Sequence, residues 1–484
     1  MVWGNKEGHR EALDSWLQRL RTNDAHFTSL HVLPARRLTP DEFAELFAAL
    51  ADNHTLTQLY CSTHAQSDAS LTALAEALGK NHTLQRLAVG DSHLAELAPI
   101  GCAALCAAVG ASQSILELDL DNKGLGLASD EDGDEEDVAV GEALRNMIAS
   151  SKSLSRLSLA RNELRDIHAQ LIAAGIRANT TGSGRLTNLD LGYNALGVET
   201  ARALAAPCTS ASPESGLHEL SLSGNEQLGV EGMVLLGAAL HGATLISSCR
   251  KLQLADMAFT PVAEGSTEVP VLATEVSPGD NFLRAFAQTT EAAAPALEML
   301  RLDRSGVTAT GAKALGQILS DPRMVLSEVA LRGNALCDEG AACLAVDVSS
   351  SAAAGFSLDL SENHLTDAGL APLLTRSRSI TQLVLFGNHI TLDTVADVAA
   401  LMQLHRMTLL DLSRNRIQAA GFARLADQLI QGAFPKLRQL EIAGNVDARQ
   451  SNDDGADTSE EVKAWAEIAA KVEAARPDLV VAWR

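Results

Sequence analysis

The chain has 484 residues, of which 46% are apolar and only 3% aromatic, a composition that predicts a large and mainly aliphatic core. Its 38 Lys and Arg residues stand against 61 Asp and Glu residues, so the net charge is −23. Such a negative surface argues against nucleic acid and anionic membranes as partners, because phosphate groups bind dense cationic faces; a protein with a basic surface is the charge-matched alternative.

The N-terminal segment 5–24 (NKEGHREALDSWLQRLRTND) is typical of a helix. We expect residues 1–24 to form a helical cap over the first of several repeats. The segment lacks the apolar run of a signal peptide, and no stretch of 18 uncharged apolar residues occurs in the sequence. We therefore expect no secretion signal and no membrane insertion.

Self-similarity organises residues 25–446. The segment NHTLTQL (53–59) returns as NHTLQRL (81–87), and a wider pattern, LxxLxLxxNxL, recurs at steps that mostly lie near 29 residues. We number this motif from its first leucine and find fourteen copies. Their fourth positions are Leu30, Leu59, Leu87, Leu118, Leu157, Leu189, Leu220, Leu252, Leu300, Val329, Leu358, Leu383, Leu410 and Leu440.

Each copy predicts a strand followed by a helix. The alternating apolar residues at positions four and six predict a short strand with one buried face. Beyond position nine the period changes, and segments 338–348, 367–377 and 418–430 carry apolar residues at the spacing of amphipathic helices. Neither element can bury its apolar side alone, so we expect stacked copies to share one continuous core.

An asparagine at position nine is predicted to be structural. At the bend from strand to helix, backbone groups leave the sheet, and an inward amide can bond them. The expected ladder is Asn162, Asn194, Asn225, Asn334, Asn363, Asn388, Asn415 and Asn445. The N-terminal copies carry His64, Ser92 and Lys123 at this position, so we expect the early ladder to be less regular.

This motif and its period resemble the leucine-rich repeat family, and its ribonuclease-inhibitor-like class in particular. The resemblance implies an α/β solenoid, or horseshoe, of about fourteen strand-turn-helix repeats, with a parallel sheet on the concave face and helices on the convex face. It also implies a non-catalytic protein–protein interaction scaffold that is a subunit of a larger hetero-complex.

Three insertions interrupt the repeats, and a second cap is predicted to follow them. The insertions lie near 129–137 (SDEDGDEED), 206–216 (APCTSASPESG) and 260–281, where loops tolerate added length. Each insertion is either a solvated loop or a contact element, and the sequence leaves this open. Residues 447–484 are expected to form a C-terminal helical cap, with Thr458 and Glu461 spaced as a capping box.

The exposed strand positions carry whatever specificity the solenoid has. Positions two, three, five, seven and eight of each copy are expected to face concave solvent. Arginine and aromatic residues are the usual anchors of protein interfaces. The predicted contact residues are therefore Tyr193, Arg301, Arg304, Arg332, Phe386 and Arg414.

The sequence shows little that predicts catalysis. It has no GxxxxGK[ST], HExxH or GxSxG motif, and no acid/base pair stands out. Its seven cysteines include no CxxC pair, which favours reduced thiols over a zinc site or a disulfide framework. We expect no enzyme, no catalytic residue, no metal and no cofactor.

One alternative function rests on a short segment. LDNKGLG (120–126) is similar to the LxNxGLG segment of the Ran GTPase-activating proteins, which are built from the same repeats. The resemblance implies that Asn122 would support the catalytic glutamine of a Ran-type small GTPase. The family continues from this segment directly into a helix, whereas here an acidic insertion follows.

The expected compartment is the cytoplasm, since no targeting segment is found and the cysteines suit a reducing environment. Cytoskeletal or ciliary association is an open alternative, because scaffolds of this class occur there.

Overall fold

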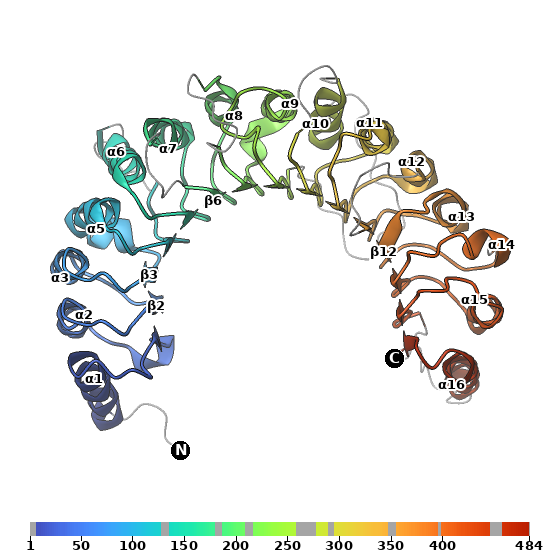
Figure 1. Ribbon diagram of the computed structural model, residues 1–484, viewed down its shortest axis with the longest axis horizontal. Coiled ribbons are helices and arrows are strands. Elements are labelled where there is room, and N and C mark those ends of the chain that lie inside the picture. The colour runs from blue at the N-terminus through green and yellow to red at the C-terminus, as the bar shows by residue number, and fades with distance from the viewer. Residues whose placement is uncertain are drawn as a thin grey trace. The chain divides into compact units, whose positions relative to one another are not determined.

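The computed structural model describes residues 6–126, 135–179, 186–208, 216–257, 277–288, 295–346, 355–394, 398–445 and 457–483. The chain divides into two compact units, which are described separately. The first comprises Met1–Leu228 and Gly242–Cys249, and the second comprises Gly229–His241 and Arg250–Arg484. In each unit the strands form one layer and the helices form a second layer outside it (Figure 1).

The first unit alternates strands and helices along the chain. Its elements are α1 (Lys6–Arg21), β1 (Ser29–His31), η1 (Pro34–Arg36), α2 (Pro40–Ala48), β2 (Gln58–Ser62), α3 (Asp68–Leu78), β3 (Arg86–Gly90), α4 (Leu94–Leu97), α5 (Pro99–Ala111), β4 (Glu117–Asp119), α6 (Glu135–Ser150), β5 (Arg156–Ser158), α7 (Asp166–Ala178), β6 (Asn188–Asp190), α8 (Val198–Ala205), β7 (Glu219–Ser221) and η2 (Glu226–Leu228).

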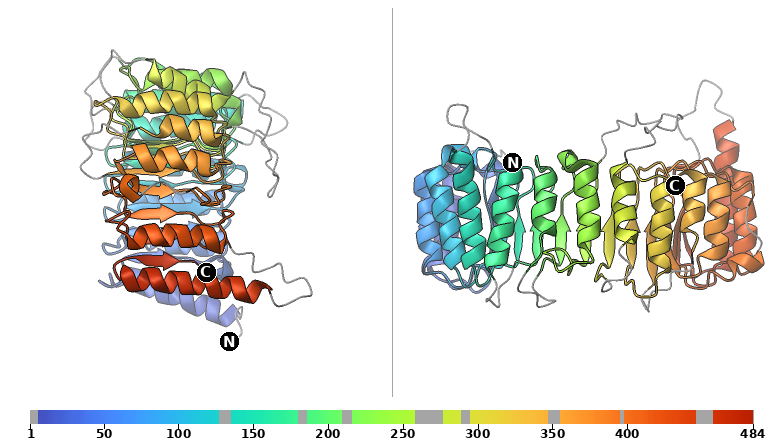
Figure 2. Two further views of the ribbon diagram at one scale, coloured as in Figure 1. Left: turned by 90° about the vertical axis from the view of Figure 1, so that its right-hand side faces the viewer. Right: turned by 90° about the horizontal axis from the view of Figure 1, so that it is seen from above.

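The second unit continues the same alternation. Its elements are α9 (Gly229–Ala239), β8 (Lys251–Gln253), α10 (Pro278–Ala287), β9 (Met299–Arg301), α11 (Ala309–Ser320), β10 (Glu328–Ala330), α12 (Cys337–Leu344), β11 (Phe356–Asp359), α13 (Asp367–Arg376), β12 (Ile380–Val384), α14 (Val398–Leu401), β13 (Leu409–Asp411), α15 (Ala419–Ile430), β14 (Gln439–Glu441), α16 (Asp457–Ala475) and β15 (Val480–Ala482). Within each unit the helices stand side by side in a row (Figure 2).

The sheets confirm the predicted strand of every motif copy. Within each unit, neighbouring strands pair in parallel and in the order of the sequence, as Leu157 with Leu189 and Val329 with Leu358 show. All fourteen fourth positions lie within strands β1 to β14 and are buried. The predicted α/β solenoid of strand-turn-helix repeats is thus confirmed.

One strand was not predicted. Residues 447–484 are expected to form a helical cap, and within them α16 is followed by β15, whose Val481 pairs in parallel with Leu440 of β14. Helix α16 buries Trp465 completely, against Phe422 of α15 at 4.7 Å between ring centroids. At the other end, α1 buries Leu13, Leu17 and Leu20. We propose that both helices cap the solenoid ends.

The core follows from two periods. Positions four and six of the strands point inward, as Leu383 and Leu385 do at 0% exposure. Helices contribute residues three or four apart, such as Phe422, Leu425 and Leu429 of α15. The core is mainly aliphatic because leucine fills most of these inward positions.

In eight copies an asparagine at position nine bonds the backbone at the bend from strand to helix. Asn388 is representative: its Nδ2 donates to the carbonyl oxygens of Leu360 and Leu385, each at 3.0 Å. Its Oδ1 accepts from the backbone N–H groups of Asn363 at 2.9 Å and Leu365 at 3.0 Å. The same kinds of bond are made by Asn162, Asn194, Asn225, Asn334, Asn363, Asn415 and Asn445.

The early copies lack these amide bonds at position nine. Lys123 donates its Nζ to the carbonyl of its own neighbour Asp121 at 2.7 Å, whereas both ring nitrogens of the buried His64 have no hydrogen-bond partner among the described residues. Instead, the asparagines of the two NHTL segments bond the backbone. Asn81 donates to the carbonyls of Leu50 and Asn53 at 2.7 and 2.9 Å.

A second column joins the helix starts. Asp280 Oδ1 accepts the backbone N–H groups of Thr308 at 2.8 Å and Gly311 at 2.9 Å, where α11 begins. Asp166, Asp338 and Asp367 do the same for the next helical segment in their stacks. Each carboxylate therefore satisfies helix N–H groups that would otherwise lack partners, and it ties one repeat to the next.

A buried histidine, His168, lies in the first turn of α7. The Nδ1 of His168 accepts the N–H of Arg165 at 3.1 Å, and its Nε2 has no partner among the described residues. Burial and then the charge of Arg165 lower the pKa of His168 from 6.5 to about 4. Between pH 6.5 and about pH 4 the unfolded chain is protonated at this histidine while the folded chain is not. The free energy of unfolding therefore decreases as the pH is lowered through this range.

We expect this single group to cost the first unit up to about 3 kcal/mol between pH 7 and pH 4. His168→Gln keeps an acceptor for the Arg165 N–H and removes the titration, so its urea midpoint is expected to fall less over this range. His82→Gln, at an exposed site, is the control. Equal pH dependence of His168→Gln and the wild type would refute the role of His168.

Candidate functional site

Position eight of the motif has a left-handed backbone in eleven copies and shapes the concave surface. Its φ angles lie between 48° and 73°. In four places a large side chain at position eight lies over a glycine at position eight of the next copy. These pairs are Tyr193 with Gly224, Arg304 with Gly333, Glu362 with Gly387, and Arg414 with Gly444.

The contact in these pairs is close. A Cβ on Gly333 would stand 2.8 Å from Cγ of Arg304, and one on Gly444 would stand 2.9 Å from Cγ of Arg414. Glycine is therefore needed twice over, for its positive φ and for the space that it leaves. The large side chains are held flat on the sheet as a result.

Three of the predicted contact residues come together in the second unit. Phe386 lies between two arginines along the stack, with the guanidinium carbons of Arg332 and Arg414 each 5.5 Å from its ring centroid. Arg332 also pairs with Glu362 at 2.6 Å. Phe386 is half-buried while both arginines are exposed. We call Arg332, Phe386 and Arg414 the arginine–phenylalanine cluster.

The two other predicted arginines of this unit are tied to acids. Arg304 pairs with Asp256 at 2.5 Å, and Arg301 lies 3.5 Å from Asp303. Burial raises the pKa of Asp303, although the N–H of Arg332 and the charge of Arg301 oppose this. Arg301 and Arg304 are thus paired with acids, as Arg332 is with Glu362, but they are not stacked on Phe386 and lie outside the cluster.

Tyr193 lies in the first unit and is not part of the cluster. Its side chain is 45% exposed, and the guanidinium carbon of Arg161 lies 4.9 Å from its ring centroid. The ring rests on Gly224 of the next copy. It is an exposed aromatic platform on its own unit's concave face.

Many concave acids serve the backbone. At position five, Asp119, Asp190, Asp359 and Asp411 each accept the N–H of the residue two positions on, at 2.8 to 2.9 Å. These turns fix the ends of the strands. The acids there are thus explained without a ligand or a catalytic role.

Asn122 occupies position eight, like Arg161 and Tyr193. It is exposed, its φ is 56°, and its backbone N–H donates to the carbonyl of Ala160 at 2.8 Å. The repeat therefore accounts for its conformation. Residues 129–134 of the acidic insertion, 209–215 of the second insertion and 260–276 of the third lie outside the described residues.

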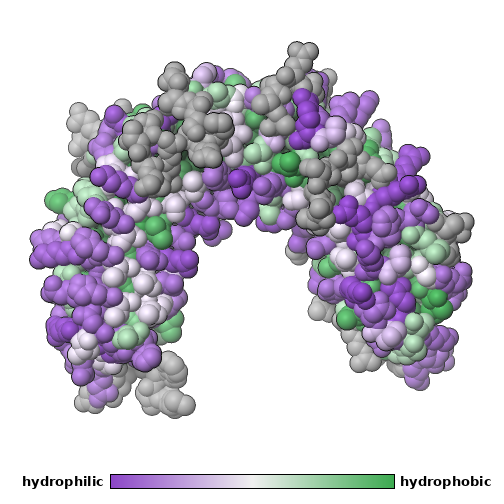
Figure 3. All heavy atoms as spheres, in the orientation of Figure 1, coloured by the Kyte–Doolittle hydropathy of each residue, from purple (hydrophilic) through white to green (hydrophobic). Residues whose placement is uncertain are grey.

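Cys61, Cys106 and Cys249 are buried. Burial raises the pKa of Cys61 and of Cys106 to about 12 each, so these thiols stay protonated at neutral pH. No three His, Cys, Asp or Glu side chains in the described ranges are grouped to hold a metal ion. Hydrophilic residues predominate on the face shown in Figure 3, with apolar residues set among them.

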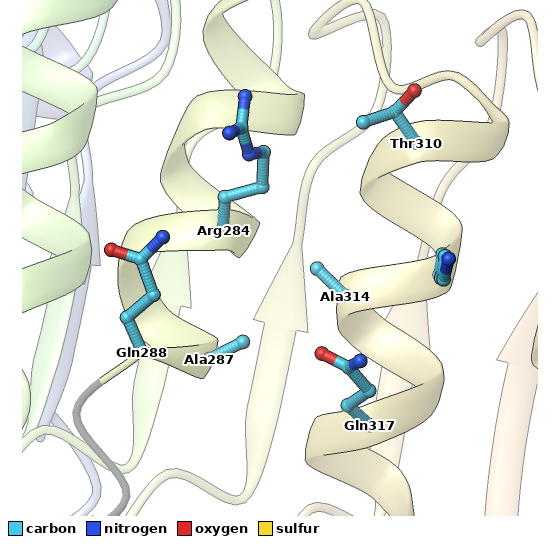
Figure 4. A pocket seen from close by; sticks show the side chains of 7 residues that line it. Arg284, Ala287, Gln288, Thr310, Ala314 and Gln317 are labelled. Atoms are coloured by element: carbon cyan, nitrogen blue, oxygen red, sulfur yellow. The ribbon is translucent and has the colours of Figure 1, made fainter.

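A shallow pocket of about 230 Å³ lies between α10 and α11 in the second unit. Ala287 and Ala314 face each other across it, and Arg284, Gln288 and Gln317 project around it (Figure 4). It is smaller than the roughly 300–1,000 Å³ of typical ligand sites. Its ionisable groups, Arg284 and Lys313, are both cations and offer no acid/base pair.

Comparison with known proteins agrees with this geometry. A family profile described as "Leucine Rich repeat" matches residues 357–374, which contain Asn363 and all of β11 but its first residue. The chain is 29% identical over 301 residues to the ribonuclease inhibitor of Sus scrofa, covering 60% of this chain and 58% of that protein. Together with the repeated strands and the asparagine ladder, these matches support a leucine-rich repeat protein of the ribonuclease-inhibitor-like class.

A second relative of this leucine-rich repeat protein is the "NACHT, LRR and PYD domains-containing protein 12" of Mus musculus, 26% identical over 338 residues. That match covers 64% of this chain and 31% of the mouse protein, so the chain spans less than two thirds of either relative. An internalin structure from Listeria monocytogenes has a TM-score of 0.40 at 17% identity, covering 84% of this chain and 94% of that one.

None of the helices in the described part of the chain combines the length and the apolar character needed to cross a bilayer.

Three features that the repeats encode were not predicted from the sequence. Pairing large residues with glycines at position eight would have identified the four stacked pairs. The acids in the first turns of four helices, such as Asp280, would have identified the column of helix caps. The third feature is a set of basic residues at position ten, described below.

Proposed function

We propose that this leucine-rich repeat protein is a non-catalytic protein-binding module whose partner docks on the concave face of the second unit. The observation that carries the proposal is the arginine–phenylalanine cluster. Its phenylalanine ring lies between two exposed guanidinium groups on a rigid sheet. Aromatic residues and arginines dominate the binding energy of protein interfaces, and here they are adjacent.

The cluster is held in place before any partner arrives. Glu362 fixes Arg332, and Gly444 leaves the space in which the aliphatic part of Arg414 lies. Side chains that are already ordered lose less conformational entropy on binding. This pre-organisation favours the cluster over scattered exposed arginines as the centre of an interface.

The relatives agree with a binding role. One of them is, by its name, an inhibitor of a ribonuclease, and inhibition of an enzyme requires contact with it. All seven cysteines of this chain are free, which suits a reducing compartment such as the cytoplasm. We propose a cytoplasmic hetero-complex as the setting.

Affinity capture tests the proposal. The full chain should retain its partner from an extract of the native source, identified by mass spectrometry. The variant Phe386→Ala with Arg414→Ala should retain at most about a tenth as much, since anchors of this kind each contribute 1–2 kcal/mol or more. Met402→Ala, which removes an apolar side chain that is 48% exposed elsewhere in this unit, is the matched control.

Retention that is equal for the wild type and the cluster variant would contradict a site on this face. Circular dichroism and urea midpoints of both proteins must agree, so that lost binding is not lost folding. If Tyr193→Ala alone abolished retention of the partner, the interface would have to lie on the first unit.

A further inference from the structure

Three adjacent copies of the second unit carry a basic residue at position ten, directly after the ladder asparagine. They are His364, His389 and Arg416. The N–H of His389 donates to the carbonyl of Leu365 at 2.7 Å, and the N–H of Arg416 donates to that of Ile390 at 2.9 Å. The copies therefore stay in parallel contact past the strands, and their position-ten side chains stand in a row about 4.8 Å apart.

The row is compact at its imidazoles, and a fourth basic residue stands close to it in the sequence. The ring centroids of His364 and His389 are 5.6 Å apart. Arg414, two residues before Arg416, belongs to the same copy. Both arginines are exposed and both histidines are half-exposed. We call His364, His389, Arg414 and Arg416 the basic rim.

The acids beside the rim are already engaged. Glu362 pairs with Arg332 at 2.6 Å. Asp367 accepts the N–H groups of Leu392 at 3.0 Å and Asp393 at 2.8 Å. Among the described residues, no carboxylate pairs with Arg414 or Arg416 within 4.0 Å. Among the described residues the rim is thus a basic spot without a neutralising carboxylate at its arginines, although the net charge of the chain is −23.

We propose that the basic rim binds an acidic polypeptide segment of the partner, whose Asp or Glu side chains pair with Arg414, Arg416 and the two histidines. This inference rests on the proposed function, because the rim adjoins the arginine–phenylalanine cluster through Arg414. Charge complementarity is local here and opposite in sign to that of the whole chain.

A polypeptide fits the rim better than a nucleic acid. Polyphosphates need an extended cationic face, and here four groups stand in a strongly negative chain. The neighbouring Phe386 adds an apolar surface for an uncharged side chain of the same segment. An acidic segment that includes an apolar residue would use both features.

The histidines make the rim sensitive to pH. Burial lowers the pKa of His364. Burial lowers the pKa of His389 as well, and the charges of Arg416 and His364 add to this effect. Both rings are therefore neutral at pH 7.5 and become charged only below their ordinary pKa of about 6.5. Bound carboxylates stabilise the charged form, so an acidic segment binds more tightly as the pH falls towards 6.

The probe is a fluorescein-labelled peptide of glutamates with one central leucine, titrated with the full-length chain by fluorescence anisotropy. We expect saturable binding at neutral pH that weakens roughly tenfold or more in Arg414→Glu with Arg416→Glu. Lowering the pH from 7.5 to 6 should tighten wild-type binding by roughly threefold per histidine. His364→Gln with His389→Gln should remove this pH response and keep the dependence on the arginines.

The matched control reverses the charge of two exposed lysines on helices of the same unit, Lys313→Glu with Lys471→Glu. This variant should bind the glutamate peptide as tightly as the wild type. Equal weakening by this control would overturn the rim as a site, since it would mean attraction by net charge alone. Equally tight binding of a single-stranded oligonucleotide would overturn the preference for acidic polypeptide. Absence of binding to the wild type would overturn the proposal outright.

These outcomes separate the rim from the proposed function. If Phe386→Ala reduces partner capture but the glutamate peptide does not bind, the proposed binding module is supported and the assignment of the rim is wrong. If the peptide binds through the rim but capture does not depend on Phe386 and Arg414, the docking face fails while the anion-binding rim stands.

Discussion

Asn388→Ala is expected to destabilise the second unit by at least ~3 kcal/mol, because two carbonyl groups and two N–H groups lose their partners in the core. The site is 2% exposed, so water cannot readily replace the amide. The urea denaturation midpoint of the full chain, followed by far-UV circular dichroism, measures the loss.

Asn445→Ala is the matched control for Asn388→Ala. Asn445 makes the same kinds of bond, donating to Leu412 and Ile442 at 2.9 Å each, but it is only half-buried. Water can reach the groups that it leaves, so we expect less than half of the loss. A loss that is equal at the two sites, or none for Asn388→Ala, would contradict the account of the ladder.

Trp465→Ala is expected to cost ~3–5 kcal/mol, the range for deleting a large buried aromatic side chain. The indole is 0% exposed, stacked on Phe422 and 6.5 Å from the ring of Trp483. Its loss should release α16 first. Hydrogen exchange of α16, compared with that of α11, would show this as faster exchange at the C-terminal end.

Two variants refine the test of Trp465. Its Nε1 has no hydrogen-bond partner among the described residues, so Trp465→Phe removes an unpaired buried N–H and keeps most of the volume. We expect it to lose only ~1 kcal/mol. Trp16→Ala, on the half-exposed face of α1, should cost less than Trp465→Ala. If Trp465→Ala left stability and exchange unchanged, α16 would not be a cap.

The strands could be predicted because their spacing is a direct result of geometry. An inward side chain is needed at every second residue of a strand, and the same strand must return in every copy, so the leucines recur. Strand β15 was missed because it departs from this spacing. Its first motif position is Asp478 and its sixth is Trp483, and no leucine pattern remains.

The candidate site could be predicted only in part. The motif fixes that Arg332 and Phe386 point to the concave side, because both occupy position seven. It does not fix that Arg332 turns towards Glu362 or that Arg414 lies against Phe386, since these contacts depend on side-chain rotamers across three copies. The basic rim was missed because His364, His389 and Arg416 occupy position ten, two residues beyond the last position expected to face the concave side.

The stacked pairs at position eight set the smallest interchangeable segment of the second unit. Large and small residues alternate there from Arg304 to Gly444, so two consecutive copies (two rungs) form one unit of this alternation, here called a tile. Excising a single rung would bring two bulky side chains, such as Arg304 and Glu362, onto the same spot, whereas excising a tile of two would restore the alternation. Lengthening or shortening of this array, in engineering or in descent, is therefore expected to proceed in steps of two.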